Sequence, residues 1–343
     1  MEALSERKQR ILECVISGYI STAEPVGSRT VARTKGIGLS SATIRNEMAD
    51  LEEMGYLLQP HTSAGRIPSE KGYRYYVDYL MEAADVSEED RRMISEALKV
   101  EKMREVEQVI LSAARVLSAI TNQTTLIMGP QFQRSAFRQM RILPLDHKRG
   151  LVVLITDTGF IKNKVIDLPQ SLSPAELHQV VNYLNQKLYG LPIDQVTASL
   201  INELKRDLFR RLEILEQAFL LLEESLKEEE HVRVYLNGTT NILNQPEFKN
   251  VEKIRRLFAL FEQEEALFQI LEDSTDSEEV VVRIGSENTH EDIQECTLIT
   301  ACYKINRKTL GTVGVLGPTR MDYDRVIPLV RCLVDHLNRI LSN

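Results

Sequence analysis

The chain of 343 residues is 43% hydrophobic and 27% charged, and its formal net charge is −8. This composition excludes a disordered chain and suggests two or three globular domains, while the polar N-terminus and the lack of an apolar run of about 18 residues predict neither a signal peptide nor a membrane span. The four cysteines form no C-x-x-C pair, which argues against a zinc cluster or a disulfide framework and predicts a protein of the reducing cytoplasm.

Residues 5–34 predict two helices. Apolar side chains recur at helical spacing over residues 5–20, and Gly27-Ser28 can begin a second, short helix that runs to Thr34. Two glycines in residues 35–38 then predict a sharp turn. Two helices in succession before a glycine turn are the first half of a helix-turn-helix pattern.

A third helix is predicted from Ser41 to about Met54, with serines to cap its start and Gly55 in the position where glycine ends a helix. Two short strands flank the polar loop 61–66, and Ser69 opens a further helix. Two helices, a glycine turn, a third helix and a two-stranded wing form a winged helix-turn-helix. We assign residues 1–82 to this domain.

The outward side of the third helix predicts DNA binding. Its apolar stripe faces inward, so Arg45 and Asn46 face outward, where arginine can pair with guanine and asparagine with adenine in the major groove. An ordinary solvated helix is the alternative, but the preceding helix, the glycine turn and the wing favour DNA binding. Residues 25–49 also carry a net charge of +3 and residues 54–77 a net charge of +2. We expect Arg45 and Asn46 to read bases. The residues expected to contact phosphate are Arg29, Ser41, Thr43, Arg66 and Lys71.

The middle of the chain predicts a sheet between helices. Residues 83–92, rich in Asp, Glu and Ser, predict a solvated linker before an amphipathic helix that runs to about Asn122 and a short strand at Thr125–Met128. Three further strands joined by hairpin-length connections then predict an antiparallel meander. These strands are Phe137–Leu145, Leu151–Thr156 and Phe160–Leu168.

Two helices follow the meander, at Pro174–Tyr189 and at about Thr197–Lys227. The second helix has an apolar stripe with heptad-like spacing, which predicts the seam of a homodimer. The stripe consists of Leu204, Leu208, Leu212, Leu215 and Phe219, continued to Leu226. Alternatively, the same stripe packs within its own subunit.

The last third of the chain predicts four short strands and two helices. The predicted strands are Val232–Leu236, Val280–Ile284, Thr297–Lys304 and Thr309–Leu316, and the predicted helices are Val251–Leu271 and Tyr323–Leu341. The glycines of residues 311–317 lack the spacing of a phosphate-binding loop, so a strand and turn is the favoured interpretation. The six histidines lack metal-ligand spacing and no catalytic set is evident, so we expect no metal, no cofactor and no enzyme.

Three segments, Glu24–Thr30, Ser40–Glu52 and His61–Asp78, closely resemble the heat-inducible transcription repressors of the HrcA family. The resemblance implies a repressor of chaperone operons that binds an inverted-repeat operator in double-stranded DNA and depends on a GroEL-type chaperonin of the GroE system. It also implies an α+β fold in which a GAF-like domain is split by an inserted strand-helix dimerisation domain. We assign residues 88–131 and 230–343 to the GAF-like domain and residues 132–229 to the insert.

Three alternatives remain open at this point. A GAF-like body could bind a small effector, which a ligand screen by thermal shift would detect. The C-terminal body could be an enzyme with an attached DNA-binding module, although no catalytic set supports this. A winged helix used only for protein contacts would leave the positive charge of the turn, helix and wing without a purpose.

Overall fold

The structure is a computed structural model, and its helices and antiparallel sheets give the predicted α+β class. It describes residues 4–61, 64–99, 106–130, 135–146, 148–157, 161–168, 173–193, 233–274, 277, 279–305 and 308–341. Among these residues, no helix is long and apolar enough to cross a membrane.

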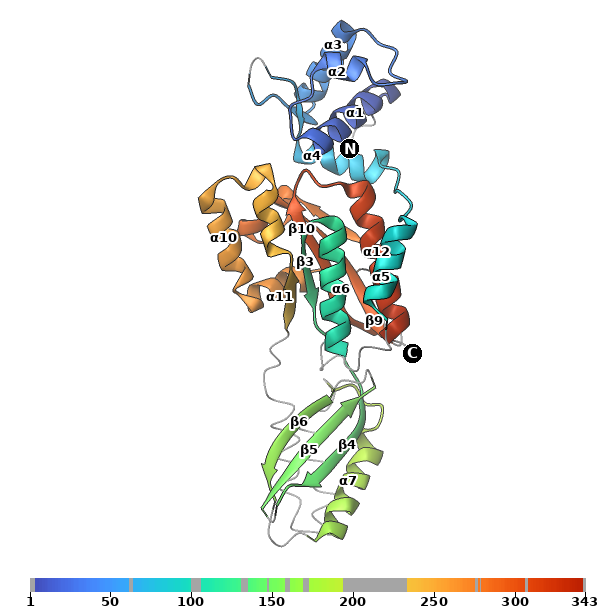
Figure 1. The fold of residues 1–343 in the computed structure, drawn as a ribbon, viewed down its shortest axis with the longest axis vertical. Helices are drawn as coiled ribbons and strands as arrows, with labels where there is room; N and C mark the ends of the chain where they lie inside the picture. The colour runs from blue at the N-terminus through green and yellow to red at the C-terminus, as the bar shows by residue number, and fades with distance from the viewer. Residues whose placement is uncertain are drawn as a thin grey trace.

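Three units follow one another along the longest axis of the molecule (Figure 1). The N-terminal unit comprises residues 4–80, the central unit residues 88–130 and 233–341, and the distal unit residues 135–193. The distal unit lies within the sequence of the central unit, so the central sheet is assembled from two separate stretches of the chain.

The N-terminal unit consists of helices around a small two-stranded sheet, in the predicted order. Its elements are α1 (Glu6–Thr22), α2 (Ser28–Ala32), α3 (Ser41–Glu53), β1 (Leu57–Leu58), β2 (Ile67–Pro68), α4 (Glu70–Tyr75) and the π-helix η1 (Tyr76–Leu80). Ser40 begins α3 as predicted, because its side chain accepts a hydrogen bond from the backbone N–H of Thr43 at 3.1 Å. Gly55 follows the end of α3 with a φ of +79°.

The central sheet is antiparallel throughout, with the strand order β7-β3-β10-β9-β8. These strands are β3 (Thr124–Met128), β7 (Val234–Asn237), β8 (Val281–Ile284), β9 (Cys296–Ile305) and β10 (Lys308–Pro318). The glycines of residues 311–317 lie within β10 and pair with β9 along that strand. The interpretation of this segment as a strand is therefore confirmed.

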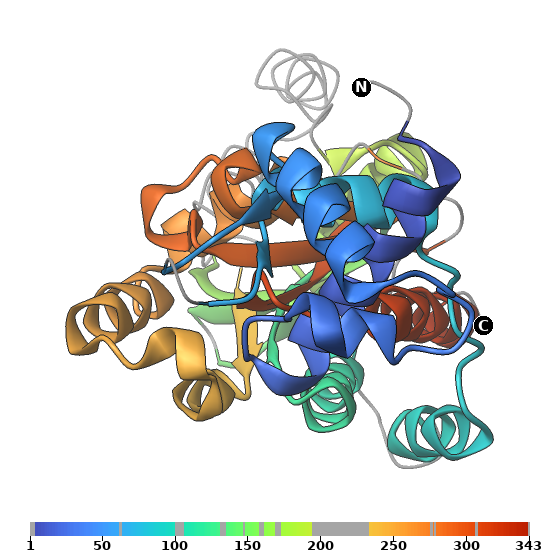
Figure 2. The same cartoon turned by 90° about the horizontal axis from the view of Figure 1, so that it is seen from above.

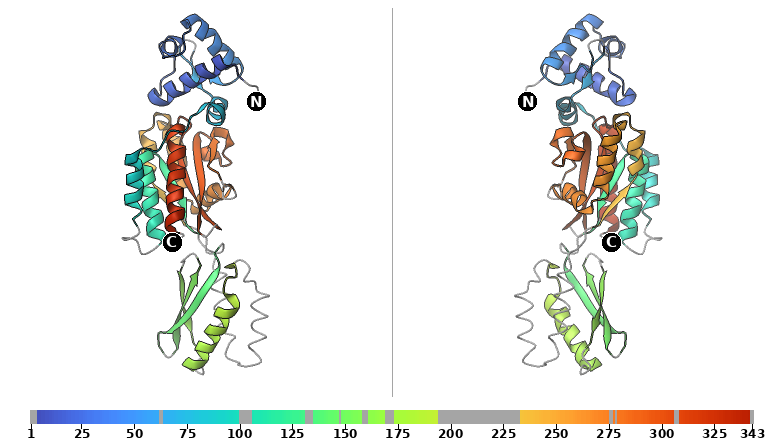
Figure 3. Two further views of the ribbon diagram at one scale, coloured as in Figure 1. Left: turned by 90° about the vertical axis from the view of Figure 1, so that its right-hand side faces the viewer. Right: turned by 90° about the vertical axis from the view of Figure 1, so that its left-hand side faces the viewer.

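Helices cover both faces of the central sheet (Figures 1 and 3). One face packs against α6 (Val106–Thr121) and α12 (Tyr323–Leu341), and the other against α10 (Val251–Phe261) and α11 (Glu264–Glu272). Helix α5 (Glu88–Ala97) packs against α6 and α12. Strand alternation explains this arrangement, because Ile299 faces the first group of helices and Leu298 the second. Short 3-10 helices connect the elements: η5 (Thr239–Asn244), η6 (Pro246–Phe248), η7 (Gly285–Glu287) and η8 (Glu291–Ile293).

The solvated linker predicted at residues 83–92 is wrong for its second half, where α5 begins at Glu88. Ser87 caps the helix by accepting a hydrogen bond from the backbone N–H of Asp90 at 3.0 Å. The acidic residues that suggested a linker are the first turn of the helix, where carboxylates are favoured by the helix dipole. Ile94 is fully buried, which anchors α5 to the core.

The single helix predicted at Val251–Leu271 is also wrong, because the chain breaks at Glu262-Gln263 into α10 and α11. Leu257 of α10 and Leu267 of α11 are both buried in the same hydrophobic cluster.

The distal unit contains the predicted antiparallel meander in the order β4-β5-β6. Its elements are β4 (Phe137–Pro144), β5 (Arg149–Thr156), β6 (Ile161–Asp167) and α7 (Pro174–Leu188). The apolar stripe predicted as a dimer seam, Leu204 to Phe219, lies outside the described residues.

One hydrophobic cluster runs from the N-terminal unit into the central unit. It contains Ile11 and Tyr73 of the first unit together with Tyr323 and Val330 of α12. Seen from the N-terminal end, α1 to α3 lie over the central unit (Figure 2). The two units therefore share a core across their boundary.

Candidate nucleic-acid interface

Helix α3 is held by its apolar stripe and by a contact at its first residue. Ile44 and Leu51 are fully buried and Met48 is 4% exposed. The hydroxyl groups of Ser28 and Ser41 lie 3.0 Å apart, which joins the beginning of α2 to the beginning of α3. This packing leaves the opposite side of α3 uncovered within the N-terminal unit.

The carboxylates of α3 that face α1 are neutralised there. The Lys8 Nζ atom lies 2.7 Å from Glu47 Oε2 and 2.7 Å from Asp50 Oδ2, and Arg7 Nη1 lies 3.3 Å from Glu47 Oε1. The hydrogen bond from Lys8 lowers the pKa of Glu47 below its usual value. The hydrogen bonds to Asp50 and Glu47 raise the pKa of Lys8. Two acidic side chains of α3 are thus compensated by cations of α1.

The remaining side of α3 forms what we call the outer face, which consists of Ala42, Arg45 and Asn46 of α3 with Arg29 of α2. All four residues are exposed. Within the described part of the chain, the side chains of Arg29, Arg45 and Asn46 have no hydrogen bond or ion pair. The outer face therefore presents cationic and amide donors beside a small residue, which permits a close approach to an acidic, hydrogen-bonding surface.

The two hydroxyl groups predicted to contact phosphate lie at the start of α3 and are partly used. Thr43 Oγ1 lies 2.9 Å from Ser40 Oγ, and Ser41 is joined to Ser28. Both hydroxyl groups remain partly exposed beside the outer face. The structure thus brings five of the seven predicted site residues together, namely Arg29, Ser41, Thr43, Arg45 and Asn46.

Arg66 and Lys71 lie at the other end of α3 and have partners within the protein. Arg66 Nη2 lies 2.7 Å from Glu52 Oε2, with the arginine side chain 17% exposed. Lys71 Nζ donates to the backbone carbonyl of Met54 at 2.8 Å and lies 4.5 Å from the ring centre of Tyr56. The Arg66 side chain connects the β1–β2 pair, and the Lys71 side chain connects α4, to the end of α3.

Sequence reasoning missed Arg7 and Lys8, which set the charge balance of α3. Lys8 precedes Glu47 by 39 residues, and no local spacing indicates that the two side chains meet. The only available signal was the helical phase of Glu47 and Asp50, which turns both carboxylates away from Arg45 and toward the packed side.

Comparison with known proteins identifies the family. A family model described as the HrcA protein C terminal domain matches residues 107–327. Proteins named heat-inducible transcription repressor HrcA are 46% identical in Natranaerobius thermophilus and 43% identical in Brevibacillus brevis, each match covering 99% of this chain and 98% of the relative. A structure titled "Crystal structure of a hypothetical protein at 2.2 A resolution" is 25% identical, covers 99% of both chains and has a TM-score of 0.65.

The relatives are named as transcription repressors, which is a non-enzymatic function and confirms the prediction that the chain is not an enzyme. The resemblance of the N-terminal segments and the match to the C-terminal domain model agree with each other along the chain. The chain therefore belongs to the HrcA family of heat-inducible transcription repressors.

Proposed function

We propose that this protein represses transcription by placing α3 in the major groove of operator DNA, with the N-terminal unit acting as a winged helix-turn-helix. The observation that carries the proposal is the outer face, whose arginines and asparagine have no partner among the described residues. The neutralisation of Glu47 and Asp50 by α1 supports it, because uncompensated carboxylates on α3 would repel the phosphate backbone.

The roles follow from side-chain chemistry. Arg45 has the planar fork that pairs with guanine O6 and N7, and Asn46 has the amide that pairs with adenine N6 and N7. Ala42 lets the helix approach the base edges closely. Arg29, Ser41 and Thr43 are placed to donate hydrogen bonds to phosphate. Arg66 and Lys71 would contact phosphate from the wing side.

Footprinting of the full-length protein on DNA upstream of its own operon tests the proposal, followed by binding measurements with Arg45→Ala. This substitution should remove about 1–3 kcal/mol of discrimination at one base position. Arg10→Ala is the matched control, because it removes an exposed arginine of α1 that pairs with Glu6. Unchanged affinities of Arg45→Ala for the operator and for scrambled DNA would show that α3 is not the recognition helix.

We propose further that the protein binds an inverted repeat as a homodimer formed by the insert, residues 132–229. The apolar stripe from Leu204 to Phe219 supports this, as does the open side of the distal sheet, where Ile161 is 59% and Val165 is 51% exposed. The two-fold symmetry of an inverted-repeat operator matches that of a homodimer. Leu212→Asp combined with Leu215→Asp should give monomers in sedimentation experiments, and a folded dimer after this change would rule out the seam.

The central unit corresponds in this proposal to a GAF-like domain in two pieces, which a chaperonin helps to assemble. Ile127 of β3 lies opposite Val313 of β10, so the sheet closes only after the whole distal unit has been made. Such long-range pairing slows folding and exposes apolar surface meanwhile. Heat-unfolded clients would then compete for the chaperonin and lower the amount of active repressor.

Refolding at a constant, moderate temperature tests this regulation. The yield of operator-binding protein should be highest with free GroEL-type chaperonin and lower with client-saturated chaperonin or with none. Equal yields under all three conditions would reject the chaperonin model and favour direct melting of the repressor.

A further inference from the structure

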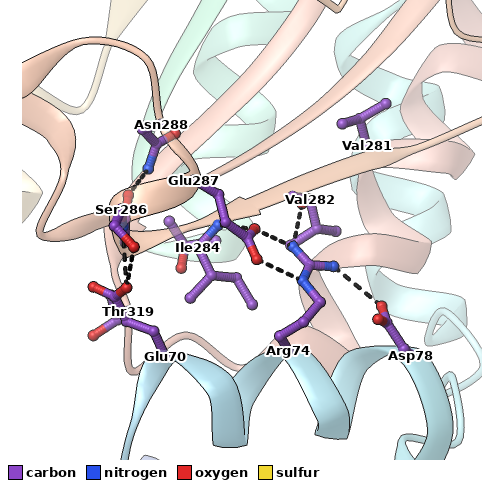
Figure 4. A network of polar contacts seen from close by, with 12 residues as sticks. Glu70, Arg74, Asp78, Val281, Val282, Ile284, Ser286, Glu287, Asn288 and Thr319 are labelled. Carbon is purple, nitrogen blue, oxygen red and sulfur yellow. Dashed lines mark hydrogen bonds and ion pairs between the residues drawn. The ribbon is translucent and has the colours of Figure 1, made fainter. Parts of the chain in front are cut away.

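The N-terminal unit is attached to the central unit by one face of α4 and η1, which the DNA-binding proposal does not use. Glu70, Arg74 and Asp78 follow one another at intervals of four residues and therefore lie along one side of this helical stretch. Figure 4 shows this side against β8 and the η7 corner. We call the contact of Glu70 and Arg74 with Val282, Ser286 and Glu287 the α4 contact, and Asp78 pairs with Arg74 beside it.

Arg74 is the centre of the α4 contact. Its Nε atom donates to Glu287 Oε1 at 2.9 Å and its Nη2 atom donates to Glu287 Oε2 and to the carbonyl of Val282. Its Nη1 atom donates to Asp78 Oδ1 at 3.1 Å. Two parallel hydrogen bonds to one carboxylate restrict direction as well as distance. Hydrogen bonds with Glu287 and Asp78 raise the pKa of Arg74, so its charge is secure.

Glu70 adds a second pair of hydrogen bonds one helical turn away. Its Oε2 atom accepts from the backbone N–H of Ser286 at 3.2 Å and from the Ser286 hydroxyl at 2.5 Å. Glu70 approaches so closely that a Cβ atom on Gly285 would lie 2.1 Å from Glu70 Oε1, and Gly285 has a φ of +58°. The positive φ favours glycine at this position, and the absence of a Cβ leaves room for the Glu70 carboxylate.

The η7 turn, which contacts α4, is stabilised by hydrogen bonds within the central unit. The buried Asn288 side chain donates to the carbonyls of Gly285, Ile293 and Cys296 at 2.9, 3.1 and 2.9 Å. Glu287 Oε2 also accepts from the backbone N–H of Ile284 at 2.8 Å. The α4 contact therefore joins a helix of one unit to a braced turn of the other.

Two further contacts join the units at separate places. Arg320 donates to the carbonyl of Ile20, in the last turns of α1, at 2.6 Å, and Glu247 holds its Nε atom at 2.5 Å. Tyr76 donates to Asp324 Oδ1, at the start of α12, at 2.6 Å. The two units therefore contact each other through polar side chains at three separate places.

We propose that the α4 contact sets the orientation of the N-terminal unit on the body and thereby determines which spacing between operator half-sites the dimer accepts. The inference depends on the proposed function, in which a dimer binds an inverted repeat. Each added base pair separates the half-sites by about 3.4 Å and rotates one against the other by about 35°. A rigidly held recognition helix cannot follow such a change, whereas a loosely tethered one can. Arg74 is accordingly a positioning residue that does not touch DNA.

The test measures binding of the full-length protein to inverted repeats whose spacer is changed in steps of one base pair, and to a single half-site. The wild-type protein should bind one spacing best. Arg74→Gln should leave half-site affinity unchanged, and should reduce the ratio between the best spacing and spacings two base pairs away by about fivefold or more, the usual range of coupling between sites. Glu287→Gln should act in the same way, since it breaks the same pair from the other side.

The control is Arg233→Gln, which removes an ion pair with Glu107 at 3.0 Å inside the central unit and should not alter the spacer profile. A second measurement needs no DNA. Because the Ser286 amide hydrogen is bonded to Glu70 of the N-terminal unit, its hydrogen exchange reports opening of the α4 contact. Exchange at Ser286 should become faster by about tenfold or more in Arg74→Gln.

The outcomes separate the inference from the proposed function. Faster exchange together with a broadened spacer profile supports the inference. An unchanged spacer profile in Arg74→Gln and Glu287→Gln overturns it, and so does unchanged exchange at Ser286. Tighter operator binding by either variant also overturns it, because the contact would then oppose binding. A wild-type protein that binds neither inverted repeats nor half-sites refutes the proposed function, while the exchange experiment still decides whether Arg74 holds the two units together.

Discussion

Arg45 and Arg74 belong to the same small unit and differ in what surrounds them. Arg45 lies on the outer face, exposed and without an ion pair among the described residues, whereas Arg74 donates to two carboxylates and a backbone carbonyl. The nearest carboxylates explain the difference. Lys8 binds Glu47 and Asp50 of α3, whereas Arg74 binds Asp78 and Glu287 beside α4. One side of the N-terminal unit is thus left available for a ligand while the other is attached to the body.

This contrast shows that net charge says little about binding until the ion pairs are assigned. The chain carries a net charge of −8, yet the two charged residues of the outer face, Arg29 and Arg45, are both cations. Substitutions at Tyr73, Lys8 and Lys71 test this difference between the exposed and the attached side of the N-terminal unit.

The largest effect is expected at Tyr73, which is 2% exposed and packs against Tyr323 with ring centres 5.8 Å apart. Tyr73→Ala should lower the free energy of unfolding by about 3–5 kcal/mol, because it opens a cavity between the units. Tyr73→Phe should cause no loss, since the hydroxyl is buried without a hydrogen-bond partner among the described residues. Urea unfolding measures both changes.

Tyr79→Ala is the matched control, because Tyr79 lies on the same helical stretch and is 62% exposed. Its effect should stay below about 1 kcal/mol. If Tyr73→Ala and Tyr79→Ala lower the free energy of unfolding equally, burial of Tyr73 between the units adds no stability. The N-terminal unit would then not be attached to the body through this side.

The second prediction concerns Lys8, which compensates two carboxylates of α3. Lys8→Met should lower the free energy of unfolding by about 1 kcal/mol at neutral pH, a modest value because the ion pairs are partly exposed. It should also weaken operator binding, since Glu47 and Asp50 would then repel phosphate. Lys253→Met is the control, because Lys253 pairs with Glu295 on the surface of the central unit.

The stability difference between the wild type and Lys8→Met should depend on pH. The pKa of Glu47 is lowered in the folded protein by its hydrogen bond with Lys8, so its contribution is complete above the ordinary value of 4.5 and is lost as the pH falls through the lowered folded value. The pKa of Lys8 is raised, so its contribution is lost only as the pH rises beyond 10.5. The difference between the wild type and Lys8→Met should therefore shrink in acid. A difference that stays constant from pH 7 to pH 3 would contradict the ion-pair explanation.

Sequence reasoning succeeded where structure depends on neighbours in the chain. The Ser40 cap, the glycine after α3, the three-stranded meander and the last helix follow from spacing over a few residues. The outer face followed in the same way, because three inward residues determine the phase of a helix. The same local reasoning failed at Glu88 to Asp90, because an acidic run can be a solvated linker or the first turn of a helix. Only the cap at Ser87 distinguishes the two.

The ion pairs that sequence reasoning missed depend on contacts between distant residues. Lys8 meets Glu47 across 39 positions and Arg74 meets Glu287 across 213. No periodicity reports such pairs, because the side chains become neighbours only through the packing of whole units.

The smallest effect is expected at Lys71, which lies between the two sides. Its Nζ atom donates to the Met54 carbonyl at 2.8 Å, but an ammonium group has three N–H donors, so two remain for a phosphate oxygen. Lys71→Gln should weaken operator and scrambled DNA alike and reduce the slope of log affinity against log salt concentration by about 0.9, the value for one lost phosphate contact. The free energy of unfolding should fall by less than about 1 kcal/mol. Lys249→Gln makes the same charge change on the exposed surface of the central unit and should leave the slope unaltered. If Lys71→Gln lowers stability but leaves the slope of log affinity against log salt concentration unchanged, Lys71 has a structural role only. The DNA-binding surface would then include α3 but not Lys71.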